Sequence, residues 1–374
     1  MTGSSSSSSG TGGATSSSSS GGGCSPTPNQ DLDLDGWTAA NGDCNDCNPA
    51  VNPGSLELPG NALDDDCDGT ADNASPTCDS LLPVDALDPM NGAAAVDLCR
   101  VASGDGGWGV TSAKWVLPDG SVPSPQLQTF HLGHGLLSGL GPNVHVQAGQ
   151  RMLALSTGTA RQPTDPGYQD VAGFDKGYAC SSPPGFPKES PSCPGGITGT
   201  PHDGVALELT IRVPSNVTGF AYDFNHFTYE WPDYICSAYN DSFLALLSPA
   251  PPGLPDGNIA FDSQGNLISV NTSFLEVCGC AGGPPCIAGG KTFFCPLGKQ
   301  GLVGTGYQSA SGDGASTGWL VSTAPVVPKQ TIKLRWTVYD SGDGVLDATT
   351  LIDNWKWLTS PNIQVTTSRI VTPK

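Results

Sequence analysis

The chain has 374 residues, among them 50 Gly and 33 Pro, and only 13% of its residues are charged. This composition excludes a protein built on long helices and favours an all-β chain with many loops. The formal net charge is −20, and the residues before Arg100 include no Lys or Arg, so nucleic acid and anionic membrane surfaces are excluded as partners of this part.

Residues 1–30 are rich in Ser and Gly, so we expect a disordered linker that acts as a flexible tether. Cys24, at the end of this tract, is either a disulfide partner or a free thiol. The 13 cysteines form no repeated Cys-x-x-Cys pattern and indicate an oxidising compartment, hence a secreted or cell-surface protein. No signal peptide is recognisable after Met1, so we expect it to lie outside this chain, and no apolar run is long enough to span a bilayer.

Residues 31–75 carry two acidic motifs of the same spacing, Asp31-Leu-Asp33-Leu-Asp35-Gly36 and Asp64-Asp65-Asp66-Cys67-Asp68-Gly69. Carboxylates at alternate positions can converge on one ion, while the Gly allows a sharp turn. Because no Lys or Arg balances these acids, a divalent metal is the expected counter-ion, and hard oxygen ligands favour calcium. The predicted ligands are Asp31, Asp33, Asp35, Asp43, Asp46, Asp64, Asp66, Asp68 and Asp72.

Neither motif is a complete EF-hand, because the twelfth position is Gly42 in the first and Ser75 in the second instead of a bidentate Glu. Further candidate oxygen ligands are Asn45, Asp46, Asn48 and Glu57. The alternative is a solvated acidic linker. The interleaved Cys44, Cys47 and Cys67 instead favour a small loop module stapled by calcium and disulfides.

Residues 76–104 are predicted to form a linker that contains a short helix. Cys78 and Cys99 enclose the helical candidate at residues 82–98, and a disulfide between them would pin it to the following body. Connectivity cannot be read from sequence, so this pairing is a hypothesis.

Residues 105–374 are predicted to form a β-sandwich body of jelly-roll-like type. Residues 205–213 and 331–339 alternate apolar and polar side chains, which is typical of strands with one buried face. Shorter strand candidates cover residues 242–247, 266–270 and 318–321. Short strands joined by loops rich in Pro and Gly favour two packed sheets.

A second set of acidic residues lies beside the predicted strand ends of the body. Its members are Glu230, Asp241, Asp340, Asp343 and Asp347. Oxygen ligands from different loops are suited to one further structural calcium at the edge of the sandwich. Because Asp, Asn and Gly are also ordinary turn residues, a structural role in turns is the alternative.

The cysteines of the body are expected to form disulfides. Cys180 and Cys193 are expected to close one loop. Two further bridges are expected among Cys278, Cys280, Cys286 and Cys295. A zinc site of four thiolates is the alternative for this group, but it is disfavoured in an exported chain. Since seven cysteines lie after residue 100 and six before it, one thiol is free or one bridge crosses between domains.

Several stretches of the body are recognisable, namely Tyr229-Glu230, Asn240-Asp241-Ser242-Phe243, Asp256-Gly257-Asn258-Ile259-Ala260, Thr317-Gly318-Trp319-Leu320 and the segment from Asp340 to Asp353. Over about residues 85–358 they resemble the choice-of-anchor L domain family of bacterial exported proteins. This resemblance implies a secreted or cell-surface protein whose anchoring signal varies between members. The chain ends without an apolar sorting tail, so any anchor is expected to precede it.

The acidic front, with Gly42-Asp43-Cys44 and Asn52-Pro53-Gly54 between its two motifs, is similar to a metal-binding motif that often precedes such domains in myxobacterial proteins. The motif is related to a repeat named after a methanotroph copper-binding surface protein, MopE. Copper is therefore a rival ion. Copper prefers imidazole or sulfur donors, whereas residues 31–75 contain no His and only cysteines expected to be oxidised, so calcium remains favoured.

No catalytic constellation is recognisable, so we expect a non-enzymatic structural or adhesive surface protein. The chain lacks a Gly-x-Ser-x-Gly elbow and a phosphate-binding Gly-x-x-x-x-Gly-Lys, and its five histidines lack helical His-Glu-x-x-His spacing. The expected partners are calcium and a surface polysaccharide or another surface protein.

Two other functions are kept as alternatives. A carbohydrate-binding module would use exposed aromatic rings, for which the candidates are Trp108, Trp115, Trp231, Trp319, Trp355 and Trp357. A secreted hydrolase would use a carboxylate pair such as Glu230 and Asp233.

Overall fold

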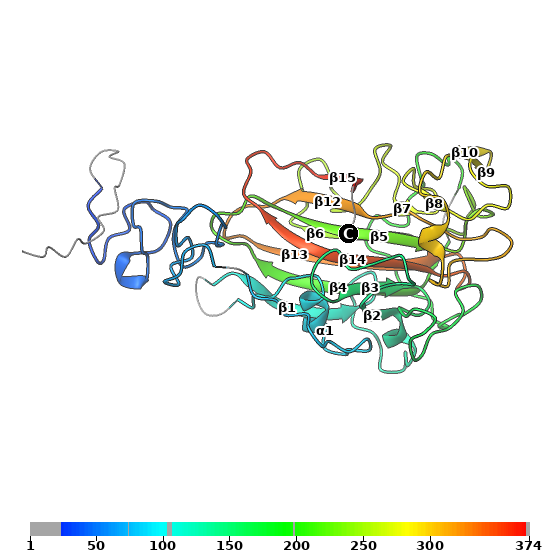
Figure 1. Ribbon diagram of the computed structural model, residues 1–374, viewed down its shortest axis with the longest axis horizontal. Helices are drawn as coiled ribbons and strands as arrows, with labels where there is room; N and C mark the ends of the chain where they lie inside the picture. Colours follow the sequence, from blue (N-terminus) through cyan, green and yellow to red (C-terminus); the bar gives the residue numbers. More distant parts are fainter. Residues whose placement is uncertain (1–23, 74, 103–106, 197–198, 372–374) are drawn as a thin grey trace, which may run out of the picture.

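The computed structural model describes residues 24–73, 75–102, 107–196 and 199–371 (Figure 1). Of the linker predicted over residues 1–30, residues 1–23 therefore lie outside the described residues. The protein is an all-β fold in which a small N-terminal module projects from one end of an elongated β body (Figure 1). Among the described residues, no helix is both long and apolar enough to span a membrane.

One face of the body is a five-stranded antiparallel sheet. In spatial order its strands are β1 (Gly109–Val116), β4 (Pro201–Arg212), β13 (Thr331–Ser341), β6 (Ser242–Ser248) and β7 (Ile268–Ser269). The two strands predicted from alternation are its central pair, β4 and β13. Leu209 pairs with Leu334 and Leu207 with Trp336, so both strands turn their apolar side chains to the same face.

The other face is an eight-stranded sheet. Its main path is β15 (Thr366–Arg369), β12 (Leu320–Pro325), β5 (Gly219–Thr228), β14 (Ala348–Leu358), β3 (Met152–Ser156) and β2 (His134–Leu137), and β11 (Ala315–Ser316) and β8 (Val277–Cys278) join it through β5. A separate two-stranded ribbon consists of β9 (Cys286–Ala288) and β10 (Lys291–Phe293).

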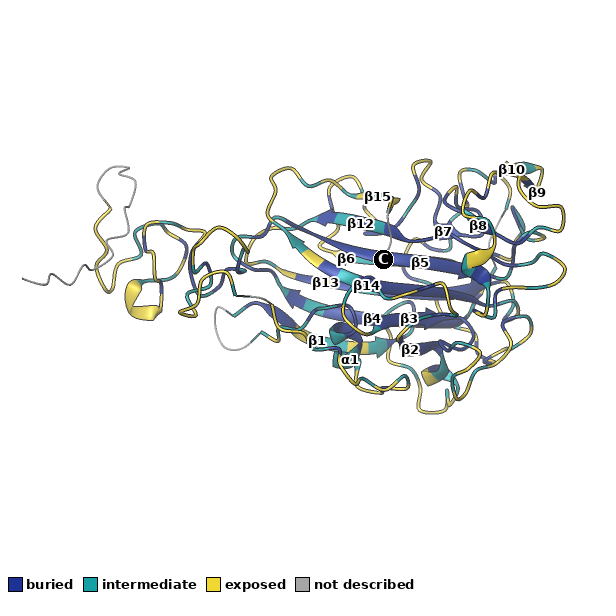
Figure 2. Ribbon diagram, viewed as in Figure 1, coloured by how far each residue is buried: buried dark blue, intermediate teal, exposed yellow. Residues whose placement is uncertain are grey.

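The two sheets enclose one apolar core, so the predicted β-sandwich is confirmed. Tyr222 of β5 packs against Trp336 of β13 with ring centroids 5.3 Å apart, and Phe224 of β5 packs against Phe243 of β6 at 5.2 Å. These contacts cross from one sheet to the other. Figure 2 shows the central strands buried along most of their length.

Within the described part of the chain, helical structure is limited to four short elements. They are η1 (Ala39–Asn41), α1 (Pro89–Ala94), η2 (Phe130–Gly133) and η3 (Gln300–Leu302). The helix predicted within residues 82–98 is α1, whose first turn is capped by the Asp88 carboxylate accepting from the backbone N–H of Met90. Ala93 and Val96 are fully buried in the core, so this part of the predicted linker packs into the body.

Paired hydrogen bonds join the N-terminal module to the loop between β4 and β5. Asn216 accepts from the backbone N–H of Leu56 and donates to its carbonyl, both at 2.8 Å. Trp108 donates its indole N–H to the carbonyl of Ser55 at 2.7 Å, and the Ser55 and Ser215 hydroxyls lie 2.9 Å apart. The module is therefore held against the body by hydrogen bonds and not only by the chain connection.

Candidate metal centre

The first acidic motif is wound into a loop around the Asp31 carboxylate. One oxygen accepts from the backbone N–H of Leu34 at 2.7 Å, and the other accepts from Gly36 at 2.9 Å. Gly36 adopts a φ of 92°, a region that favours glycine because it has no Cβ. The hydrogen bonds and the glycine fold the alternate carboxylates back towards one another.

The first loop brings together two groups of carboxylates that share Asp33. Asp31, Asp33 and Asp46 form one, and Asp33, Asp35 and Asp43 form the other, with the ligand oxygens in each group within 4.8 Å of one another. Three oxygens no more than 4.8 Å apart share a point that is at most about 2.8 Å from each of them, a range that includes the 2.3–2.6 Å of calcium–oxygen bonds. The spacing of the oxygens is therefore compatible with one shared ion.

The second loop forms a third group, from Glu57, Asp64 and Asp66. Glu57 positions it by accepting from the backbone N–H groups of Asp65 at 2.9 Å and Asp72 at 2.6 Å. Arg100, the first basic residue of the chain, reaches Asp66 at 3.3 Å. One positive charge thus faces three carboxylates.

Several of the grouped oxygens are buried without a hydrogen-bond donor. They are Oδ2 of Asp33, Asp35, Asp43 and Asp46 and Oδ1 of Asp66. Buried carboxylate oxygens are costly unless paired, and those of the first loop cluster around the same two centres. This observation favours a metal ion over a solvated acidic linker.

The electrostatics of the groups agree with this interpretation. Burial and the charge of Asp33 raise the pKa of Asp35, and burial together with Asp35, Asp33 and Asp46 raises the pKa of Asp43. Burial and the nearby Asp68 raise the pKa of Asp66 despite the opposing effect of Arg100. Without a cation the carboxylates repel one another, and a bound ion would remove this penalty.

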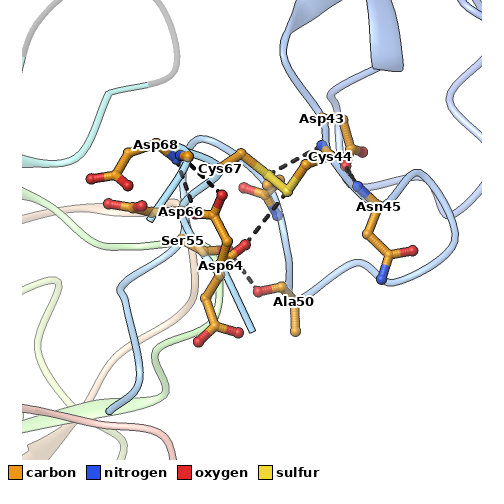
Figure 3. The surroundings of a disulfide bond; sticks show 12 residues. Asp43, Cys44, Asn45, Ala50, Ser55, Asp64, Asp66, Cys67 and Asp68 are labelled. Carbon is orange, nitrogen blue, oxygen red and sulfur yellow. Dashed lines mark hydrogen bonds between the residues drawn. A yellow bond between two sulfur atoms is a disulfide. The ribbon is translucent and has the colours of Figure 1, made fainter. Parts of the chain in front are cut away.

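Two disulfides tie the module together. Cys24 pairs with Cys47, so it is not a free thiol, and Cys44 pairs with Cys67. Figure 3 shows the second bridge between the two acidic loops, with Asp43 on one side and Asp64, Asp66 and Asp68 on the other. The bridge therefore couples the first two groups of carboxylates to the third.

Two predicted ligands lie outside the three groups. Asp72 accepts from the backbone N–H groups of residues 60–62 and so stabilises a turn. Asp68 is exposed and accepts from the N–H of Thr70 and the amide of Asn73. Their carboxylates are used locally, because a backbone N–H in a tight turn lies nearer than the shared centre. The Asn48 side chain is also used locally, since its oxygen accepts from the backbone N–H of Ala50 at 3.2 Å.

Part of this module has a counterpart among known families. Residues 43–73 match a family described as a "Putative metal-binding motif", Cu-binding MopE. The match begins at Asp43, so it includes Asp43 and Asp46 of the first loop and all of the second loop, but not the motif from Asp31 to Gly36. No curated protein and no solved structure matches the chain.

The donor set of the module fits a hard cation better than copper. Every grouped atom is a carboxylate oxygen. The sequence from residue 24 to 73 contains no His or Met, and its four cysteines are bonded in disulfides. Copper favours imidazole, thiolate or thioether donors, whereas calcium takes oxygen ligands.

The second acidic set is only partly assembled at the end of the sandwich. Glu230, Asp241 and Asp340 are buried there, with Glu230 accepting from the backbone N–H of Asp241 at 3.0 Å. Asp347 is also buried, but Asp343 is partly exposed and accepts from the N–H of Val345 in a turn. No three carboxylates of this set come within 4.8 Å of one another. Asp343 therefore has the structural role in a turn that was the alternative to metal binding.

The cysteines of the body differ in one pairing from the prediction. Cys193 pairs with Cys236, and Cys180 is a free thiol. Cys180 lies beside Gly204 of β4, where its backbone N–H donates to Pro201, so it is held away from the Cys193 loop. The nearest cysteine in sequence was therefore the wrong partner, and Cys236 was overlooked.

The remaining bridges of the chain follow the prediction. Cys78 pairs with Cys99. Cys278 pairs with Cys295 and Cys280 with Cys286. Because all four sulfur atoms of the last group are used in disulfides, they are not available as the thiolates that a zinc site requires.

Proposed function

We propose that this protein is an exported, non-enzymatic surface scaffold whose N-terminal module is made rigid by calcium. The observation that carries the proposal is the convergence of buried, unpartnered carboxylate oxygens on shared centres in the module. A short, Gly-rich segment cannot obtain order from a core, and bound metal together with disulfides supplies it instead.

Calcium is proposed as the ion because the grouped donors are all carboxylate oxygens. Calcium prefers oxygen ligands and tolerates a variable number of them in flexible geometry. Magnesium demands near-ideal octahedral geometry at 2.0–2.1 Å and usually keeps several waters, so a cage of protein carboxylates is better suited to calcium. The name of the matched family raises copper, but the donor set offers no soft ligand.

A structural or adhesive role is supported by the way the module is mounted. The hydrogen bonds of Asn216 and Trp108 fix it at one end of the sandwich, so ordering the module would order its position as well. The disulfides and the matched motif fit an extracellular protein, where millimolar calcium would keep weak sites filled.

The structure supports the two alternative functions less well than the scaffold function. Of the six tryptophans considered for sugar stacking, Trp108, Trp231, Trp319 and Trp355 are buried, and Trp115 is stacked on His134. Glu230, the proposed hydrolytic carboxylate, is 2% exposed, so a polymeric substrate could not reach it.

The proposal is tested by calcium titration of the full chain after removal of bound metal with EGTA. We expect isothermal titration calorimetry to detect calcium binding, and limited proteolysis to show protection of residues 24–73 only in calcium. Copper(II) at the same concentration should protect less. Equal proteolysis with and without calcium, together with no binding heat, would overturn the proposal.

A further inference from the structure

The interior of the sandwich changes from apolar to acidic at the end opposite the module. On β13 the inward side chains run Leu334, Trp336, Val338 and then Asp340, and on β6 the inward Phe243 is preceded by Asp241. Since Tyr339 pairs with Ser242, continuing the register places Asp340 opposite Asp241. Like charges directly opposite on neighbouring strands destabilise a sheet unless something balances them.

These two carboxyl groups are deeply buried and lack donors. Asp241 is 0% and Asp340 1% exposed. Asp340 lies in hydrogen-bonding range of the Asp241 carboxyl, but no N–H or O–H donor of the described residues reaches either Asp340 oxygen or Oδ1 of Asp241. The other Asp241 oxygen accepts from the Thr157 hydroxyl at 3.1 Å. Three orphaned oxygens therefore face one another inside the protein.

The surrounding charges do not neutralise the pair. Glu230 and Asp347 add two more buried carboxyls, and Oδ2 of Asp347 also lacks a donor. The buried cation of this region is Lys176, whose ammonium donates to the carbonyl of Ser156 at 2.9 Å and forms no ion pair within 4.0 Å among the described residues. Burying several carboxylates with one ammonium that pairs directly with none of them is strongly unfavourable.

We propose that a divalent cation of calcium type binds between Asp241 and Asp340 and holds the neighbouring ends of β6 and β13 together at this end of the sandwich. Asp241 and Asp340 belong to the five-stranded sheet. Glu230 follows β5, and Asp347 precedes β14 of the other sheet. Because no three of these carboxylates lie within 4.8 Å, the pair supplies the direct ligands and Glu230 and Asp347 balance the charge, while water fills the remaining positions that calcium tolerates.

This site is separate from the metal centre of the module. Lys329, next to the start of β13, contacts the backbone carbonyl of Asp35 in the module, whereas Asp340 is at the other end of the same strand. Nine residues of extended chain separate Thr331 from Asp340, which corresponds to roughly 30 Å. Either site can thus be present without the other.

The competing arrangement is a proton shared between the two carboxyls. Burial and the charge of Asp241 raise the pKa of Asp340, so an ion-free pair would hold a proton at neutral pH. The two arrangements differ in one measurable respect: a shared proton makes the body indifferent to calcium, and a bound ion does not.

The test starts from a full-length variant whose module groups are disabled by Asp33→Asn and Asp66→Asn. Its metal content is measured by plasma mass spectrometry as purified, after EGTA, and after return of calcium chloride. We expect one calcium per chain to remain or return, and the melting temperature of the body to fall by several degrees in EGTA. Adding Asp340→Asn should remove that calcium, whereas adding Asp233→Asn, an exposed residue nearby, should not.

Two results would overturn the inference. One is a module-disabled variant that holds no calcium at millimolar concentration and melts at the same temperature in EGTA. The other is calcium content unchanged by Asp340→Asn. If Asp340→Asn fails to fold, the first measurement still decides, because it needs no change in the body. If the module binds no calcium but the body does, the proposed function fails and this inference stands. If the body binds no calcium but the module does, this inference fails and the proposed function stands.

Discussion

Asp33 offers the sharpest test of the module because it belongs to both carboxylate groups of the first loop. Asp33→Asn keeps the shape of the side chain and removes one charge. At an effective dielectric constant of about 20, two unit charges 4 Å apart interact by about 4 kcal/mol. Partial exposure of Asp33 and replacement by an amide oxygen reduce this loss, so we expect calcium binding to weaken roughly tenfold to hundredfold, or about 1.4–2.7 kcal/mol.

The same change predicts a loss of stability. At a calcium concentration of 100 times the dissociation constant, one site stabilises the folded module by about 2.7 kcal/mol. A tenfold to hundredfold weaker site leaves about 1.4 to 0.4 kcal/mol at that concentration. Calorimetric titration gives the affinity, and urea unfolding followed by amide hydrogen exchange of residues 24–73 gives the stability.

Asp68→Asn is the matched control for this experiment. It makes the same change of charge in the same module, but Asp68 is exposed and lies outside the three carboxylate groups. We expect its calcium affinity to stay within about twofold of the parent. If Asp68→Asn and Asp33→Asn weaken binding equally, the acidic residues act only through net charge, and the reasoning from convergent oxygens is refuted.

Three further predictions concern stability. Replacing Cys44 and Cys67 with Ser removes a bridge across 23 residues, which by loop entropy should cost about 3 kcal/mol in urea unfolding of the module; no change would show that the reduced loops stay closed. Asn216→Ala removes the paired hydrogen bonds to Leu56 and should cost about 1–3 kcal/mol, with faster amide exchange at residues 54–58 and unchanged exchange in the core strands. Burial raises the pKa of Asp353 to about 8 despite three backbone N–H donors. The folded state therefore retains a proton that the unfolded state releases near pH 4, so stability should fall by up to about 1.4 kcal/mol per unit between roughly pH 4 and 8. Asp353→Asn should flatten that slope, and parallel pH profiles of parent and variant would contradict it.

Alternation located two of the central strands, and a third alternating segment was overlooked. β4 and β13 were predicted within a few residues of their bounds. β5 and β14 were not predicted, although in β5 Phe220, Tyr222 and Phe224 alternate with Ala221, Asp223 and Asn225. Because β5 is buried at all ten positions, its Asp, Asn and His residues suggest a loop in the sequence although they lie inside the protein.

The candidate site shows a similar division. The phase of the acids predicted that Asp31, Asp33 and Asp35 would lie in one loop, as they do. The sequence could not show that Asp72 would be used by three backbone N–H groups, or that Glu57 would join Asp64 and Asp66. Which oxygen reaches a shared centre depends on the turn geometry, and composition and spacing do not specify it.

The overlapping disulfides of the module have a mechanical consequence. A pull entering at Cys24 crosses 6.0 Å to Cys47, follows three residues back to Cys44 and crosses 5.6 Å to Cys67. This covalent route is about 22 Å long, whereas the 43 residues from Cys24 to Cys67 would extend to about 150 Å without the bridges. The rest of each acidic loop forms a closed ring beside this route. Tension on the N-terminal side would therefore bypass the grouped carboxylates except Asp46, which lies on the route between Cys44 and Cys47.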